Sequence, residues 1–484
     1  MTMIFSAIHT IHKRFEHWIF NAYSTNVNQL GLYRILFASA IIFLIGIPQY
    51  NVKIAAFPAG VFNPPPFFSF FFSDIPPLWY FQWTDGLICL GFLFVLLGLF
   101  TRSAGVITAL LIIINNGFIF STGKIDHSFL VWFTLFILSF SGWGNAFSID
   151  SIIQRKAHNR TNNWIISLLS LSIGFSFFTA GMIKFLSGWL SLSDSMLRAF
   201  YLRNFYIQQK QDYLAPYFEN FTFQPFWELG DWFTIIFEVG FLLVVFIPAL
   251  FRFYTLLALF FHGFVLLMMN IGFDTFIPMY LLFWIPLIDT SRAQKTFEAW
   301  IKNKKKIIGI VILLVGVYGI NWWLKDVASL PLSDLLIFTG LLGSLFILFI
   351  RPQLIFREVN KPDEVKIIMF DGVCNLCNGF VQFVIQRDKQ AIFKFKPLQD
   401  STSDDTDLQS IILVKDGEHL NKSKAFLEII RNLHGFWPYL YLTIIIPRPI
   451  RDAVYVFVAN NRYKWFGKRD TCMIPTKELK DRFL

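Results

Sequence analysis

Long apolar runs dominate the first 350 residues, and short polar or basic segments separate them. A helix needs roughly 20 apolar residues to cross the hydrocarbon core of a bilayer, and somewhat fewer suffice inside a bundle. The runs do not alternate between apolar and polar positions, as the strands of a β-barrel would. We therefore predict a polytopic α-helical membrane bundle of about ten spans, of which the second and eighth are short enough to be re-entrant. The ten runs are 31–48, 86–100, 103–120, 127–145, 163–185, 231–250, 253–270, 274–289, 306–324 and 333–350.

The pattern changes near residue 360, where shorter segments typical of a soluble domain begin. Residues 365–370 form an apolar, β-prone run, and a helical pattern then extends to about residue 387. Further on, a hairpin turn is predicted at Asp416-Gly417. The mixture favours a small α/β sheet domain. The remaining predicted strands are 391–396 and 410–415, and the remaining predicted helices are 423–433 and 451–460.

Composition supports this division. The chain of 484 residues is 55% hydrophobic and 19% aromatic, and only 15% of its residues are charged. Charged residues make up 27% of the 124 residues from Lys361 onward but 11% of the first 360. These values exclude a single soluble fold, a disordered chain and a secreted disulfide scaffold. We predict an N-terminal interfacial segment at 1–30, a membrane domain at 31–300, an extra transmembrane hairpin with a linker at 301–360, and a cytoplasmic domain at 361–484.

The net charge of +10 comes from 42 Lys and Arg against 32 Asp and Glu. The basic residues cluster at the ends of apolar runs instead of forming a stripe interleaved with aromatics, so we predict a lipid bilayer and no nucleic acid as partner. Cytoplasmic loops of membrane proteins carry such an excess of Lys and Arg. If Lys13 and Arg14 are cytoplasmic, alternating spans return every basic loop to that side. We expect a multi-pass protein of the inner cell membrane with both termini cytoplasmic and the 186–230 loop outside.

Ionisable residues inside apolar runs suggest function, because burying a charge in a membrane is costly. Lys184 ends the fifth run and His127 begins the fourth, and the predicted topology puts both at the outer face. A Lys beside apolar helices favours its neutral form, which makes the amine available as a base. The structural alternative is that Lys184 reaches the headgroups and His127 caps a helix. Glu238 and His262 lie deeper, and we expect them to pair with each other, as a structural hydrogen bond or as a proton relay.

Several short segments resemble, in order, the membrane region of the vitamin K-dependent gamma-glutamyl carboxylase family, which is called the HTTM domain. The segments are 30–37 (LGLYRILF), 47–49 (IPQ), 126–128 (DHS), 180–184 (AGMIK) followed by Trp189, and 261–262 (FH). The resemblance implies that Lys184 is the base that deprotonates a vitamin K hydroquinone and that His127 lies in the same site. We expect Trp189, Glu238 and His262 to contact this lipid-soluble ligand, with a quinone or hydroquinone as the candidate cofactor.

The chain departs from the carboxylase pattern near this site. Asp126 stands where the carboxylase has Asn, and Ile183 replaces one of two adjacent lysines. A soluble domain follows the last span directly, in place of the large luminal region that engages the peptide substrate. Carboxylation of a protein substrate is therefore not expected, while chemistry on a quinol-like membrane ligand fits the residues that remain.

Cys374 and Cys377 form a CxxC pair after the predicted strand and the Asp371-Gly372 turn, at the start of the predicted helix. The amides and dipole of a helix N-terminus stabilise a thiolate. Cys374 should therefore be the more exposed nucleophile and Cys377 the resolving thiol, as in a thioredoxin-like arrangement. A zinc site would need Cys472 with His419 or His434 at irregular spacing, so we predict no metal.

The C-terminal region closely resembles the DCC family of predicted thiol-disulfide oxidoreductases. The matching segments are 371–377 (DGVCNLC), 397–399 (PLQ), 446–447 (IP), 451–455 (RDAVY) and 461–472 (NRYKWFGKRDTC). The resemblance implies a thioredoxin-like fold, a redox-active dithiol and a third family cysteine, Cys472. A reducing cytoplasm keeps such a pair mostly as thiols, so a structural disulfide is not expected.

We therefore predict a membrane-bound oxidoreductase-like protein. Its bundle binds a lipid-soluble ligand at an outward-facing Lys184, and its cytoplasmic domain exchanges thiols and disulfides, with a cytoplasmic thiol protein as the candidate partner. The two sites would lie on opposite sides of the membrane, so a membrane quinone or a helix movement would have to couple them. The alternative is a transporter or scaffold with a regulatory thioredoxin-like module, whose path would use Glu238, His262 and Asn115-Asn116.

Overall fold

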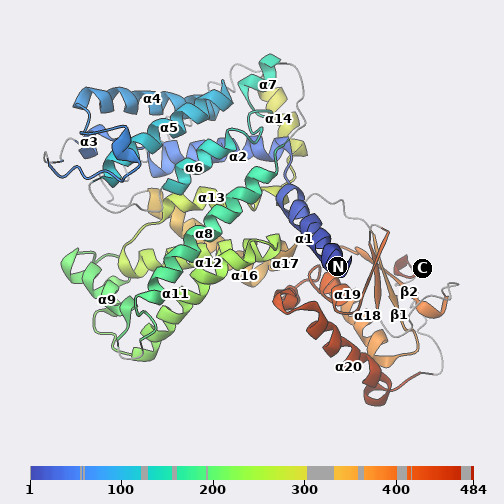
Figure 1. Ribbon diagram of the computed structural model, residues 1–484. Coiled ribbons are helices and arrows are strands. Elements are labelled where there is room, and N and C mark those ends of the chain that lie inside the picture. The colour runs from blue at the N-terminus through green and yellow to red at the C-terminus, as the bar shows by residue number, and fades with distance from the viewer. Residues whose placement is uncertain are drawn as a thin grey trace. The chain divides into compact units, whose positions relative to one another are not determined.

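The computed structural model describes residues 2–54, 57, 60–121, 129–154, 161–191, 194–301, 332–357, 365–400, 411–415, 417–469 and 481–484. The chain divides into two compact units, Met1–Ser344 and Leu345–Leu484. Figure 1 shows that the first unit is helical throughout and that the second contains a sheet.

Six of the described helices are long and apolar enough to cross a membrane. They are α2 (Val27–Ser39) with its π-helical extension η1 (Ala40–Ile45), α4 (Leu78–Leu97), α5 (Thr101–Phe120), α8 (Trp164–Leu186), α12 (Pro248–Met269) and α16 (Leu332–Ile350). On α4, Leu87, Leu90 and Leu93 are exposed although they are apolar, as expected for a helix face that meets lipid.

The other predicted runs differ from regular apolar spans. Run 231–250 falls mostly within α11 (Gln224–Val244), and run 127–145 contains the ten-residue apolar helix α6 (Phe129–Leu138). Run 274–289 is divided into η4 (Asp274–Phe276), α13 (Ile277–Leu281) and η5 (Ile285–Leu287), because Pro278 and Pro286 each start a new helix. Run 306–324 lies outside the described residues. The structure confirms six apolar helices, and the number of about ten spans stays a prediction.

The first unit also contains helices outside the ten predicted runs. They are α1 (Thr2–Asn21), α3 (Asn51–Ile54), η2 (Phe68–Phe70), α7 (Ile149–Gln154), α9 (Met196–Leu202), η3 (Arg203–Ile207), α10 (Ala215–Phe218) and α14 (Ser291–Ile301).

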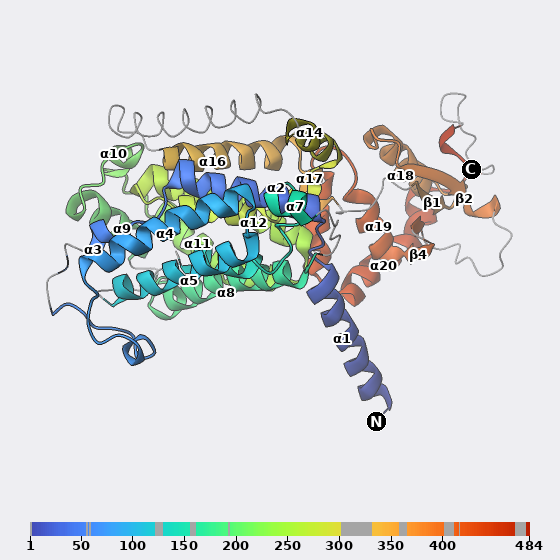
Figure 2. The ribbon, with the colours of Figure 1, turned by 90° about the horizontal axis from the view of Figure 1, so that it is seen from above.

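Helices α8 and α11 lie side by side in both views (Figures 1 and 2). Two glycines of α8 permit this close approach. A Cβ atom added at Gly174 would lie 2.5 Å from Val245 Cγ2, and one added at Gly181 would lie 2.9 Å from Glu238 Cβ. Small residues let helix backbones approach in membrane bundles. The close contact brings the end of α8 next to Glu238.

The second unit is built on a mixed four-stranded sheet of order β2-β1-β3-β4. Strand β1 (Lys366–Phe370) is parallel to β2 (Phe393–Pro397) and antiparallel to β3 (Ile412–Lys415), which forms a hairpin with β4 (Glu418–Asn421). Helix α18 (Asn375–Arg387) connects β1 to β2, and the helices after β4 are α19 (Lys422–Ile430), η7 (Trp437–Ile445) and α20 (Arg448–Phe466). The predicted α/β domain is therefore confirmed, with strands and helices within a few residues of their expected positions.

The core of the second unit fixes where its functional residues lie. Ile368 and Phe370 of β1 are fully buried against Val381 and Val384 of α18. In β2, buried Phe393 and Phe395 alternate with half-buried lysines, as expected for a strand with one face on the core. Strand β1 is central in the sheet, so the residues that follow its carboxyl end are held rigidly at the start of α18.

Candidate functional site

Cys374 and Cys377 lie between β1 and α18, where the sequence predicts them. Cys374 is the N-cap of α18, and the Asn378 N–H donates a hydrogen bond of 3.0 Å to its carbonyl oxygen. Cys377 follows in the first turn of the helix, and both residues are free thiols. Residues three apart on a helix are neighbours, so the two thiols are placed to form a disulfide with each other.

The predicted order of exposure is wrong. Cys374 is completely buried, whereas 9% of Cys377 is exposed. The segment that follows α20 pairs with the backbone around the first cysteine: Lys468 forms an antiparallel bridge with Cys374, and the Arg469 N–H donates to the carbonyl oxygen of Val373 at 2.9 Å. This segment is far along the chain, so no local pattern around the CxxC pair reveals it.

The environment of Cys377 keeps it protonated. Burial raises the pKa of the Cys377 thiol to about 12, and the neighbouring Cys374 thiol and Asp371 carboxylate add to the shift. The Arg462 guanidinium acts in the opposite direction, because it favours the thiolate. A neutral thiol at physiological pH agrees with the predicted resolving role.

Asp371 is the centre of a polar cluster beside the two thiols. Its Oδ2 accepts hydrogen bonds from the Tyr463 hydroxyl and, at 3.2 Å, from Arg462 Nη2. Its Oδ1 accepts from Gln399 Nε2 at 2.9 Å. Burial raises the pKa of Asp371, but these hydrogen bonds outweigh it and hold the pKa below its ordinary value. Asp371 was predicted only as part of a turn and Arg462 was not predicted to have a role, although both lie in segments that resemble the DCC family.

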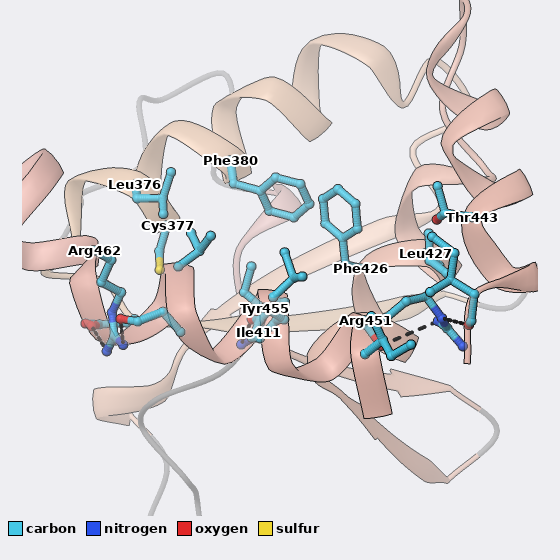
Figure 3. Close-up of a pocket in the computed structure, with 17 residues that line it drawn as sticks. Leu376, Cys377, Phe380, Ile411, Phe426, Leu427, Thr443, Arg451, Tyr455 and Arg462 are labelled. Atoms are coloured by element: carbon cyan, nitrogen blue, oxygen red, sulfur yellow. Dashed lines mark hydrogen bonds and ion pairs between the residues drawn. The ribbon is translucent and has the colours of Figure 1, made fainter. Parts of the chain in front are cut away.

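An apolar cavity of about 490 Å³ lies beside Cys377, between α18, α19 and α20. Figure 3 shows Phe380 of α18 opposite Phe426 of α19, with Cys377 and Arg462 at one end of the cavity and Arg451 at the other. Its size is in the range of roughly 300–1,000 Å³ that small-molecule sites occupy. The sequence did not predict this cavity, because its walls come from three separate helices.

In the membrane unit, the structure brings Lys184, Glu238 and Trp189 together. Lys184 Nζ donates to both carboxylate oxygens of Glu238, with a distance of 2.6 Å to Oε2. The Lys184 side chain is 24% exposed and that of Glu238 is 6% exposed. The ring centroid of Trp189 lies 5.4 Å from Nζ. This salt bridge between α8 and α11 was not predicted, because the sequence analysis assigned Glu238 to His262.

His262 lies on α12 in an aromatic cluster. Its ring stacks on Phe273 with a centroid distance of 4.5 Å and lies 6.2 Å from the ring of Phe177. Phe177 belongs to α8, the helix that carries Lys184. His127 and Cys472 lie outside the described residues, so their roles stay predictions.

The two asparagines required by the transporter alternative connect neighbouring helices. Asn115 Nδ2 donates to Thr84 Oγ1 at 2.8 Å, which joins α5 to α4. The Tyr50 hydroxyl donates to Asn116 Oδ1 at 2.9 Å. Both asparagines are buried. The Asn115 bond joins two helices, and bonds of this kind stabilise a membrane bundle.

The apolar helices and the dithiol domain together define a multi-pass membrane protein with a redox domain. The chain belongs to the HTTM domain family, whose family model matches residues 23–287. The model of the DCC1-like thiol-disulfide oxidoreductases matches residues 368–468, which include the CxxC pair and Arg462. Both resemblances read from the sequence are thus confirmed.

Two relatives match the C-terminal part of the chain. The uncharacterized protein YuxK of Bacillus subtilis is 44% identical over 128 residues, which cover 25% of this chain and 93% of that protein. A chloroplastic DCC family protein of Arabidopsis thaliana is 37% identical over 122 residues, which cover 23% of this chain and 71% of that protein. No solved structure matches the chain.

Proposed function

We propose that the chain is a membrane-bound thiol-disulfide oxidoreductase in which Cys374 and Cys377 form the redox pair. The observation that carries the proposal is the CxxC pair at the start of α18 beside the buried cluster of Asp371 and Arg462. The domain consists of a β1-α18-β2 unit followed by a β3-β4-α19 unit. This order supports a thioredoxin-like fold.

In the reducing direction, a Cys374 thiolate attacks one sulfur of a substrate disulfide, forms a mixed disulfide and releases one substrate thiol. Cys377 then loses its proton and attacks the Cys374 sulfur, which releases the second substrate thiol and leaves an intramolecular disulfide. Arg462 favours the Cys377 thiolate in this second step. Because Cys374 is buried and its backbone pairs with Lys468, we infer that a protein substrate reaches that thiol only after the 467–469 segment moves. A cytoplasmic thiol protein is the proposed partner in exchange.

The test is the rate at which the purified chain reduces glutathione disulfide, compared with a variant that carries both Cys374→Ser and Cys377→Ser. The proposal predicts exchange by the native chain and only the uncatalysed rate for the variant. Equal rates would contradict it.

For the bundle, we infer a site for a quinone-like or other lipid-soluble ligand beside Lys184 and Trp189, with His127 and His262 as further site residues. The salt bridge supports this inference, because it places a proton acceptor next to the amine. The Lys184 ammonium passes a proton to Glu238, and the neutral amine then takes a proton from a ligand hydroxyl. A lipid-soluble ligand needs an apolar contact surface next to the amine, and the Trp189 ring provides one.

Binding of reduced 2,3-dimethyl-1,4-naphthoquinone in nanodiscs tests the bundle site. We expect Lys184→Ala to weaken binding, and full retention would remove Lys184 from the site. Loss of function in Glu238→Gln together with full function in Lys184→Ala would favour the transporter alternative.

We also propose about ten spans, an inner-membrane location and cytoplasmic termini, on the basis of the basic loops. Labelling with a membrane-impermeant maleimide tests this arrangement. Gln208→Cys should react from outside intact cells and Asn460→Cys only after lysis, and the reverse pattern would invert the topology.

A further inference from the structure

The cavity beside Cys377 has an apolar body and polar ends. Its apolar wall is formed by Leu376, Phe380, Ile411, Phe426, Val454 and Val458. Asp371 also lines the cavity, and Figure 3 shows Arg462 at the end at which the Cys377 thiol lies. A ligand that fits has an apolar or aromatic body and a polar, reducible group next to the thiol.

The mouth of this cavity is itself apolar. Ile446, Ile450 and Val454 line the cavity and are 41%, 57% and 61% exposed. Phe457 extends the exposed surface along α20, because positions 450, 454 and 457 share one helix face. We call Ile450, Val454 and Phe457 the α20 apolar face. An apolar ligand can therefore enter the cavity along exposed apolar side chains, beside the polar lining residues Thr443 and Arg451.

Contacts inside the second unit place this region at the end of a membrane-spanning helix. The Tyr439 hydroxyl of η7 donates a hydrogen bond of 2.5 Å to the carbonyl oxygen of Leu348, in the last turn of α16. The ring of Phe356, in α17 (Gln353–Phe356), lies 6.0 Å from the ring of Tyr439. The chain segment between Tyr439 and α20 therefore starts at the membrane boundary.

The exposed side chains next to this contact suit a membrane surface. Aromatic and aliphatic side chains here are Phe436, Trp437, Leu440 and Ile445, all exposed. Trp and other amphipathic rings collect at the level of the headgroups. Arg448 and Arg451 begin α20 beside them, and basic residues on an amphipathic helix are attracted to anionic lipids.

We propose that the α20 apolar face rests on the bilayer and that the cavity takes up a lipid-soluble quinone from it, which the Cys374 and Cys377 dithiol reduces. This inference rests on the proposed dithiol function. Two electrons pass from the thiols to the quinone: both S–H bonds break, the S–S bond forms, and the two protons end on the quinone oxygens. The product is a hydroquinone, the class of ligand proposed for the bundle site.

The experiment uses the reduced full chain in nanodiscs that contain anionic lipid. The probe is 2,3-dimethyl-1,4-naphthoquinone, whose two substituted ring positions hinder thiol addition, and its reduction is followed by absorbance. Val458→Trp fills the cavity, Val454→Trp blocks the mouth as a second variant, and Asn460→Trp is the control on the exposed side of the same helix. Reduction of glutathione disulfide by each protein serves as the reference rate.

We expect the ratio of quinone reduction to glutathione disulfide reduction to fall roughly tenfold or more in both cavity variants, because the bulky ring removes the apolar contacts that bind the ligand. The ratio should not change in Asn460→Trp. An unchanged ratio in both cavity variants would overturn the inference. Equally fast reduction of the same quinone carrying a ring sulfonate would also overturn it, because the site would then be supplied from water.

Two further outcomes separate this inference from the proposed function. If the native chain reduces glutathione disulfide but not the quinone, the inference fails and the proposed function stands. If it reduces neither, both fail. Competition by an apolar disulfide-bonded peptide, with no effect of quinone, would assign the cavity to a protein substrate and contradict the inference.

Discussion

The two candidate sites bury charge by different means. In the bundle, Lys184 and Glu238 come from neighbouring helices and balance each other. In the C-terminal domain, Asp371 accepts hydrogen bonds from several donors, including Arg462 and Tyr463. Losing one partner leaves a lone charge in the bundle, where little water can replace it, but removes only part of the network in the domain. The bundle site should therefore depend more steeply on a single residue.

The largest expected effect concerns the chemistry of the domain. In Cys377→Ser, the mixed disulfide on Cys374 cannot be resolved, so catalytic exchange should fall to the background rate. Mass spectrometry after exposure to glutathione disulfide should find the adduct on Cys374. Cys89→Ser, on α4, is the matched control and should behave as the native chain. Normal turnover in Cys377→Ser would exclude the two-thiol mechanism.

The second largest effect is expected on the stability of the bundle. Glu238→Gln leaves the Lys184 ammonium without its carboxylate. Breaking a fully buried pair costs about 3–5 kcal/mol, and the partial exposure of Lys184 reduces the expected loss to about 1–3 kcal/mol. Thermal unfolding in detergent should show a lower midpoint than for Glu228→Gln on the same helix. Equal midpoints would mean that the salt bridge does not stabilise the bundle.

Part of the fold could be predicted from the sequence alone. The six long apolar helices and the strand before Cys374 follow from local patterns, so they could be predicted. Run 274–289 was predicted as a run short enough to be re-entrant, but its division into three short helices was not predicted, although Pro278 and Pro286 were visible signals. Each of these prolines starts a separate short helix.

The site partners could not be predicted in the same way. Lys184 was predicted as a site residue from its place in an apolar run together with the resemblance to the HTTM domain, but its pairing with Glu238 depends on how closely α8 and α11 pack at Gly181. Likewise, the backbone bridge between Cys374 and Lys468 forms only because the chain returns to this site after α20. Charged or reactive residues in unusual positions can be recognised in the sequence, whereas their interaction partners can be identified only in the folded structure.

A smaller, pH-dependent effect is expected in the domain. The folded-state pKa of Asp371 is below its unfolded value of roughly 3.9, so its carboxylate stabilises the fold above that pH and loses this effect as pH falls through the folded pKa. Asp371→Asn should lower the free energy of unfolding at pH 7 by about 1–2 kcal/mol.

The difference between Asp371→Asn and the native chain should close in acid, and urea unfolding across that pH range measures it. Asp481→Asn, at an exposed aspartate, is the control. A difference that is constant with pH would show that the carboxylate charge does not contribute.

The smallest effect is expected at the surface of the same domain. Lys424 Nζ lies 2.8 Å from Glu418 Oε1, but both side chains are largely exposed. Pairs of this kind contribute less than about 1 kcal/mol because water and salt screen them. Lys424→Ala should therefore change the unfolding midpoint in urea very little. A loss as large as that of Asp371→Asn would contradict the contrast between buried and exposed charges.

The most direct test of the central claim is a redox titration of the purified full chain, in which free thiols are alkylated and Cys374 and Cys377 are quantified by mass spectrometry. The account predicts that the two thiols are oxidised together, as one two-electron couple, in the range of roughly −270 to −120 mV found for catalytic dithiols. Independent oxidation of the two residues, or no disulfide between them at any potential, would contradict it.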